Sequence, residues 1–189
     1  MTKLQEMGQK AKAAARVLAN AGAKKDAALM SIADGLVANV ERIISANKID
    51  LEQARAGGMS ESMLDRLTLN EARIKDMAEG ARQVAAQTDP IGRILSGEVR
   101  PNGMKIEKVA VPLGVIGMIY EARPNVTADA AVLCLKAGNA IILRGGKEAI
   151  HSNTAITEVM RDAVESTGLP RDSIQLIEDT SRQSSVELM

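Results

Sequence analysis

The alternation of strand-like runs with helical patterns in the second half of the chain constrains the fold most. The runs are GVIGMIY (114–120), NAIILRGG (139–146) and SIQLIED (173–179), and segments with helical spacing separate them. A nearly continuous apolar run such as GVIGMIY is typical of a strand buried on both faces of a parallel sheet. Because strands that alternate with helices form such sheets, we predict an α/β fold with a doubly wound parallel sheet over residues 112–189.

Residues 1–90 show a helical pattern in which charged residues alternate with apolar ones. Apolar side chains recur there at helical spacing, which predicts helices over about 25–46 and about 69–87. The pair Gly57-Gly58 is predicted to end a shorter helix. Polar residues that can cap helix N-termini also recur, and the predicted caps are Thr2 with Gln5, Asp50, Ser60, and Thr68 with Glu71.

The sequence pattern changes from helical to β-like at residues 91–111. Two β-like runs, IGRILSGEV and MKIEKVAV, surround RPNG at Arg100–Gly103, where Pro and Gly favour a turn. We therefore predict a long β-hairpin arm. The open edges of such an arm would favour aggregation unless something covers them.

The composition excludes several classes of function. The formal net charge is zero, and the chain has one Tyr and no Trp or Phe, so neither nucleic-acid binding by stacked rings nor attachment to a membrane surface is expected. A single Cys rules out an internal disulfide and most cysteine metal sites, and no metal site is predicted. Because no secretory signal and no long apolar span is found, we predict a cytoplasmic protein.

Two turns that follow strands carry the candidate site residues, because parallel strands direct their carboxyl ends toward ligands. In YEARPN (120–125), Arg123 could bind an anion and Asn125 could donate to an oxyanion while capping the next helix. An internal ion pair and a simple cap are equally good interpretations. In RGGKE, Arg144, Gly145 and Lys147 could face a nucleotide ribose or its phosphate, although spacing alone favours a solvated turn. The motif G-x-G-x-x-G is absent.

The only Cys and the only His of the chain are not expected to take part in chemistry. Cys134 stands among aliphatic residues in the middle of a predicted helix, where a thiol is hidden and its pKa is raised. His151 has no metal-binding partner nearby and is predicted to lie at the surface, before a helix capped by Ser152 or Asn153.

Long strings of the sequence resemble one known family. VPLGVIGMIYEARPNVT and CLKAGNAIILRGGKEA are similar to the γ-glutamyl phosphate reductases, or glutamate-5-semialdehyde dehydrogenases, within the aldehyde dehydrogenase superfamily. The resemblance covers essentially the whole chain. It implies a Rossmann-like cofactor segment over 112–189, a helical part over 1–90, and oligomerisation through the 91–111 hairpin. It also implies NADPH-dependent reduction of L-glutamate 5-phosphate to the semialdehyde, with release of phosphate, in proline biosynthesis.

The resemblance also assigns roles to residues. Arg123 falls nearest the position of an oxyanion-binding Asn in the wider superfamily, two residues before Asn125. Arg144 falls at the position of a Lys near the adenosine ribose, and with Lys147 it implies NADP as the cofactor. The family's substrate is a small molecule, and an association with the glutamate kinase that supplies it is an expectation of the same kind.

The chain departs from the family at its C-terminal end. The nucleophilic Cys of these enzymes lies in a separate, later domain, and Cys134 does not match it. We therefore expect an incomplete cofactor segment, no catalytic domain, no catalytic residue within these 189 residues, and no reductase activity. The alternative hypothesis is a non-catalytic module that binds nucleotide or pairs with other subunits.

Overall fold

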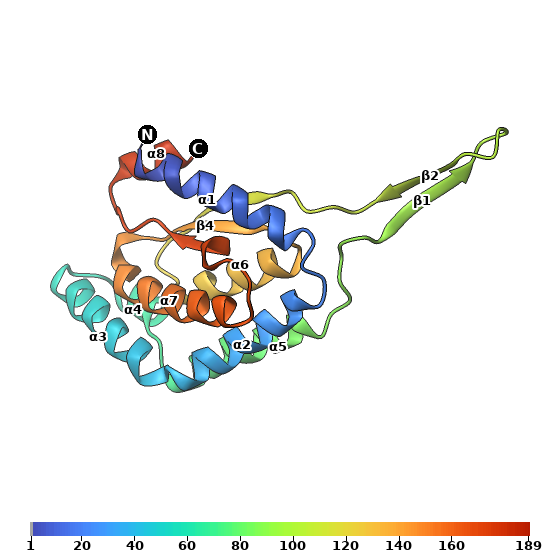
Figure 1. The fold of residues 1–189 in the computed structure, drawn as a ribbon. Helices are drawn as coiled ribbons and strands as arrows, with labels where there is room; N and C mark the ends of the chain where they lie inside the picture. Colours follow the sequence, from blue (N-terminus) through green and yellow to red (C-terminus); the bar gives the residue numbers. More distant parts are fainter. Residues whose placement is uncertain (1) are drawn as a thin grey trace.

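The computed structural model describes residues 2–189 as a layered α/β body with one projecting arm (Figure 1). Its helices are α1 (Lys3–Leu18), α2 (Lys24–Ala38), α3 (Val40–Ala56), α4 (Glu61–Leu67), α5 (Glu71–Ala85), α6 (Pro124–Lys136), α7 (Ile150–Ser166) and α8 (Arg182–Leu188). The strands are β1 (Ile94–Val99), β2 (Lys105–Val109), β3 (Val115–Ile119), β4 (Ala140–Arg144) and β5 (Ile174–Leu176), and two short 3₁₀ helices are η1 (Lys147–Ala149) and η2 (Arg171–Ser173).

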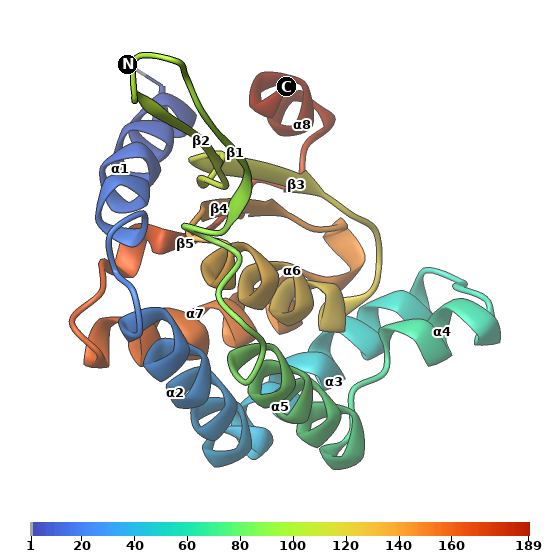
Figure 2. The same ribbon diagram turned by 90° about the vertical axis from the view of Figure 1, so that its right-hand side faces the viewer.

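The sheet of the body is parallel, which confirms the predicted α/β class. Its strand order is β3-β4-β5, with Ile116 opposite Ile141 and Ile141 opposite Ile174. Helix α1 packs on one face of the sheet, and α6 and α7 pack on the other (Figure 2). Helices α2, α3 and α5 form a further layer against α6 and α7. The carboxyl ends of β3 and β4 therefore meet at one edge of the body.

Burial on both faces was predicted for the run 114–120, which forms β3, and this prediction is wrong. The central strand β4 is buried along Ala140–Leu143, but Val115 and Ile119 of β3 keep 37% and 45% of their surface exposed. Strand β3 pairs only with β4 within residues 2–189 and so lies at an edge of the sheet. An apolar run alone cannot distinguish an edge strand from a central one, because burial depends on neighbours distant in sequence.

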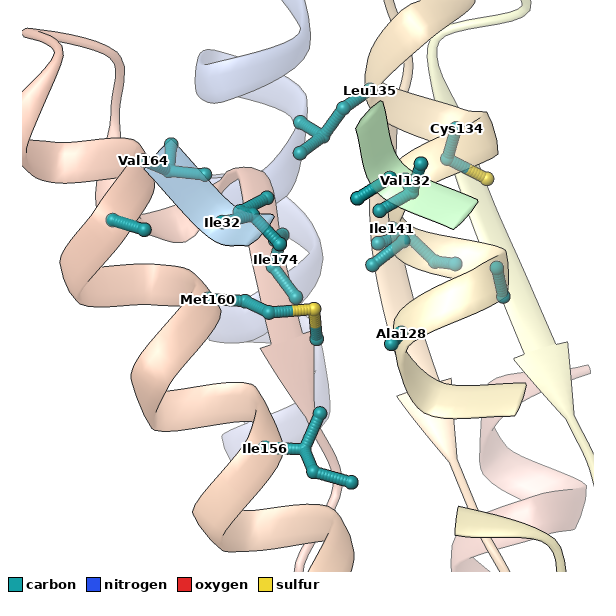
Figure 3. Packing of buried hydrophobic residues seen from close by; sticks show 14 of the residues in the cluster. Ile32, Ala128, Val132, Cys134, Leu135, Ile141, Ile156, Met160, Val164 and Ile174 are labelled. Atoms are coloured by element: carbon teal, nitrogen blue, oxygen red, sulfur yellow. The ribbon is translucent and has the colours of Figure 1, made fainter. Parts of the chain in front are cut away.

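Aliphatic side chains fill the space between the layers. Ile156 and Met160 of α7 and Leu135 of α6 project into the interior between these helices (Figure 3). Ile32 of α2 and Ile141 of β4 are fully buried in the same cluster. The near absence of aromatic residues is therefore compensated by Ala, Ile, Leu, Val and Met, whose close packing provides most of the stabilisation. Among residues 2–189 no helix is long and apolar enough to cross a membrane.

The predicted hairpin arm is present. Strands β1 and β2 pair antiparallel around a turn in which the Gly103 amide donates to the Arg100 carbonyl at 2.8 Å. Gly103 has a φ of 84°, which a residue with a side chain rarely adopts. All strand residues of the arm are exposed, including Ile94 and Val99, and the arm projects away from every other element (Figure 1).

Several predicted helix boundaries are wrong, although the Thr2–Gln5 capping box and the stop at Gly57-Gly58 are confirmed. The helix predicted over 25–46 breaks at Asn39, whose Nδ2 donates to the Gly35 carbonyl at 2.9 Å and competes with the helical pattern. Helix α5 is capped by Asn70, which accepts a bond from the Arg73 amide, rather than by Thr68.

Asp50 was predicted to begin a helix, and this is also wrong, because α3 continues through it. Its buried carboxylate accepts bonds from the His151 amide at 3.1 Å and from the Ser152 amide at 2.7 Å, and thus caps α7 from another element. The Ser152 hydroxyl also donates to it at 2.5 Å and accepts from Asn47 at 3.0 Å. Ser152 and Asn153 therefore lie inside α7 instead of capping it.

We expect Asp50→Ala to lower the free energy of unfolding by about 3 kcal/mol, because it leaves two amides and a hydroxyl of α7 unsatisfied in the interior. Urea denaturation at neutral pH measures the loss. Glu52→Ala, on the exposed side of the same helix, is the matched control and should change stability by less than about 0.5 kcal/mol. Equal effects of the two substitutions would refute the capping role of Asp50.

Candidate functional site

The turn after β3 places Arg123 and Asn125 at the carboxyl edge of the sheet. Arg123 occupies the N-cap position of α6 and Pro124 the first helical position, where its fixed φ is favourable. Asn125 is therefore inside the first turn and is not the cap, which corrects the prediction. Its Nδ2 donates to the Asp129 carboxylate at 3.1 Å, so Asn125 has a structural partner as well as an exposed position.

A cleft of about 370 Å³ opens between this turn and the α4–α5 connection. It is lined by Arg66, Thr68, Leu69, Arg73, Asp76, Met77, Arg123, Asn125 and Asp129. Burial raises the pKa of the Asp129 carboxyl above its usual value, and the bond from Asn125 opposes this shift. Three guanidinium groups and two carboxylates thus share one concave surface, an arrangement suited to a ligand that carries charges of both signs.

Buried hydrogen bonds fix the wall of this edge. The Tyr120 hydroxyl lies 2.6 Å from the Thr127 hydroxyl, which donates to the Asn153 Oδ1 at 2.9 Å. Tyr120 therefore donates to Thr127, and burial raises the pKa of its phenol to about 12 while the bond to Thr127 opposes the shift. These bonds hold the end of β3 against α6 and α7, so the turn that carries Arg123 has a rigid base.

The turn after β4 contains the predicted cofactor residues, and these residues differ in their contacts. The Arg144 guanidinium donates to the Gly145 carbonyl at 2.8 Å, to Thr180 at 2.7 Å and to Ser181 at 3.0 Å, so most of its donors hold the chain that leads to α8. Lys147, in contrast, is exposed at the start of η1 and forms no ion pair within residues 2–189.

Gly145 has a packing requirement. A Cβ atom there would lie 2.2 Å from the Asn153 Nδ2 and 3.1 Å from the Tyr120 ring, so any side chain would displace that network. The close approach that glycine permits at this turn is thus used by the protein's own side chains, and Lys147 is the member of the predicted set that is directed toward solvent.

Cys134 and His151 are outside both turns. Cys134 is 8% exposed on α6, and burial raises the pKa of its thiol to about 11, in agreement with the prediction that this thiol is hidden and its pKa raised. His151 lies in the first turn of α7 and is half-buried, rather than preceding the helix at the surface as predicted.

The sequence prediction missed the contribution of α4 and α5 to the cleft. Arg66, Arg73 and Asp76 come from DRLTLNEARIKD, which looks like an ordinary solvated helix pair. Only the tertiary fold brings them opposite Arg123. The sequence signal for this part of the cleft was the pair Arg66 and Arg73 on either side of a predicted helix break. This signal is weak, because charged residues on exposed helices are common.

Comparison with known proteins identifies the family of the chain. Residues 2–189 match the model described as "Aldehyde dehydrogenase family", and the chain belongs to that family.

Within the family, its relatives named gamma-glutamyl phosphate reductase are similar along the whole chain. One from Syntrophomonas wolfei is 50% identical over 99% of this chain and 45% of its own length, and one from Bacillus anthracis is 52% identical over 100% and 46%. The crystal structure of gamma-glutamyl phosphate reductase from Thermotoga maritima is 42% identical, with a TM-score of 0.97 over 99% of this chain and 45% of that chain. The chain thus spans about half the length of the curated relatives it matches.

We expect Cys134 to resist alkylation in the folded chain. At pH 8 a thiol with a pKa of about 11 has roughly 200-fold less thiolate than an unfolded one, so iodoacetamide should react at least that much more slowly in buffer than in urea. Because Cys134 is the only Cys, mass spectrometry follows its modification directly. Equal rates in both conditions would show that the thiol is accessible.

Proposed function

We propose that the chain provides the cofactor side and part of the substrate site of an enzyme that reduces L-glutamate 5-phosphate to L-glutamate 5-semialdehyde. NADPH supplies the hydride when bound, phosphate is released, and the product enters L-proline biosynthesis. The observation that carries the proposal is the position of an arginine-lined cleft and an exposed Lys at neighbouring ends of β3 and β4. The names of the relatives at about half identity support the same reaction.

Arg123 and Asn125 are the proposed contacts for the substrate and for the developing oxyanion. Both line the cleft, and the first turn of α6 contributes amides at the positive end of the helix dipole. A nucleophile is still required, and residues 2–189 offer no accessible thiol because Cys134 is buried. We therefore propose that the 189-residue chain by itself has no reductase activity.

For the cofactor we propose NADP, with Lys147 as the cation that faces the ribose phosphate. Arg144 and Gly145 are proposed to shape the same turn, Arg144 by holding the carbonyls of Thr180 and Ser181 and Gly145 by permitting the close packing of Tyr120. The residues fit an anionic group because Lys147 is exposed beside the end of a buried strand, where nucleotide-binding sheets place their ligands.

The outer parts of the molecule have proposed roles as well. The fully exposed hairpin over 91–111 is proposed to pair with other subunits, because its apolar residues and open edges are those of an interface. We propose residues 1–90 as the helical part of the cofactor domain, 112–189 as its βαβαβ segment, and the cytoplasm as its location. A contact with the glutamate kinase that supplies the substrate belongs to the same proposal.

We expect Lys147→Ala to weaken NADPH binding about tenfold, since it removes one charge-assisted contact, and to leave NADH binding within about twofold. Isothermal titration of the chain with each dinucleotide measures both affinities. Lys105→Ala, which removes an exposed Lys of the distant arm, is the control and should change neither. Equal losses for NADPH and NADH would contradict the assignment to the ribose phosphate.

A chimera tests the reaction. Residues 1–189 replace the matching 46% of the Bacillus anthracis relative, and NADP reduction is followed with glutamate semialdehyde and phosphate. We expect turnover by the chimera, none by the 189-residue chain, and a change of less than about twofold for the chimera with Cys134→Ala, because a buried thiol takes no part in the chemistry. Turnover by the 189-residue chain that is lost on Cys134→Ala would overturn the assignment.

A further inference from the structure

The cleft between α4–α5 and α6 contains charges that the fold itself does not use. The Arg73 guanidinium is occupied, since it donates to the Thr68 carbonyl at 2.7 Å and pairs with Asp65 at 2.8 Å. Arg66 and Arg123 line the same cleft, and neither forms an ion pair or hydrogen bond through its guanidinium within the described chain. Two exposed cations without internal partners therefore face one concave surface.

The two carboxylates of the cleft also have few internal partners. Asp76, on α5, has no internal ion-pair partner among residues 2–189, and Asp129, on α6, has only the amide of Asn125. Both side chains are exposed, so their carboxylates remain available to a cation. The cleft thus offers two sites for anions and at least one for an ammonium group, within the volume of about 300–1,000 Å³ that is usual for small ligands.

We propose that this cleft binds the amino-acid end of the substrate as well as its phosphate, an inference that rests on the proposed function. The ligand class is an α-amino acid with a phosphorylated side-chain carboxylate. Arg123, at the carboxyl end of β3 where the reacting group lies, binds the phosphate. Arg66, at the end of α4, binds the α-carboxylate, and Asp76 with Asp129 binds the α-ammonium group.

Hydrogen bonds hold the backbone segments that carry Arg66 and Arg123. Buried Asn47 donates to the Leu67 carbonyl at 2.8 Å and accepts from the Leu69 amide at 2.8 Å, which fixes the segment that follows Arg66. Arg73 braces the same segment through Thr68. Arg123 has its own rigid base on Tyr120 and Thr127, so the backbone positions from which both arginines extend into the cleft are held by buried hydrogen bonds.

Two probes test the two ends of the site in the 189-residue chain. L-Glutamine carries the α-amino acid group without a side-chain charge, and inorganic phosphate carries the other group. We expect amide NMR titrations to show shifts around the cleft, with Arg66→Gln weakening L-glutamine about tenfold and Arg123→Gln weakening phosphate about tenfold. Arg55→Gln, an exposed substitution outside the cleft, should change neither affinity.

The outcomes separate this inference from the function on which it rests. Unchanged urea midpoints establish that the variants fold. Shifts mapped away from the cleft, no saturable binding of L-glutamine, or equal effects of Arg66→Gln and Arg55→Gln overturn the inference, even if the chimera is active. Binding that depends on Arg66 in a chain whose chimera is inactive supports the amino-acid site and overturns the reductase reaction instead.

Discussion

The buried carboxylate of Asp50 is the interaction on which the arrangement of the body depends. It lies on α3, far in sequence from the sheet, yet it accepts hydrogen bonds from two amides in the first turn of α7 and from the hydroxyl of Ser152. A buried carboxylate is costly unless its oxygens are satisfied, and a helix N-terminus is among the best partners because amides and dipole act together. The helical layer and the strand–helix layer are therefore joined by a polar contact as well as by apolar packing.

That contact extends to the candidate site through Asn47 and Ser152. Asn47 bonds Ser152 on one side and both the Leu67 carbonyl and the Leu69 amide on the other. The segment that carries Arg66 and Thr68 is thereby tied to the start of α7, which follows directly from the β4 turn. The wall of the cleft and the turn after β4 consequently share one buried network, and a change at Asp50 should affect both.

The sequence predicted those features that depend on local patterns. The strand–helix alternation, the hairpin with its turn at Arg100–Gly103, the Thr2 cap and the burial of Cys134 all follow from periodicity, turn chemistry and neighbouring residues. The edge position of β3, the role of Asp50 and the part of the cleft formed by α4 and α5 follow from tertiary contacts. An Asp before a helical pattern is a good local cap, and nothing in its own neighbourhood shows that it caps a helix 100 residues later.

The basic residues of the site also differ in a way that spacing could not reveal. Arg73 and Arg144 use their guanidinium groups on backbone carbonyls and hold segments in place. Arg66, Arg123 and Lys147, in contrast, form no ion pair or side-chain hydrogen bond with any residue from 2 to 189. Arginine suits the first role because its planar group bridges several carbonyls at once. Arg73 thus holds the segment next to Arg66, and Arg144 holds the turn that precedes Lys147, so that less backbone freedom is lost when a ligand binds.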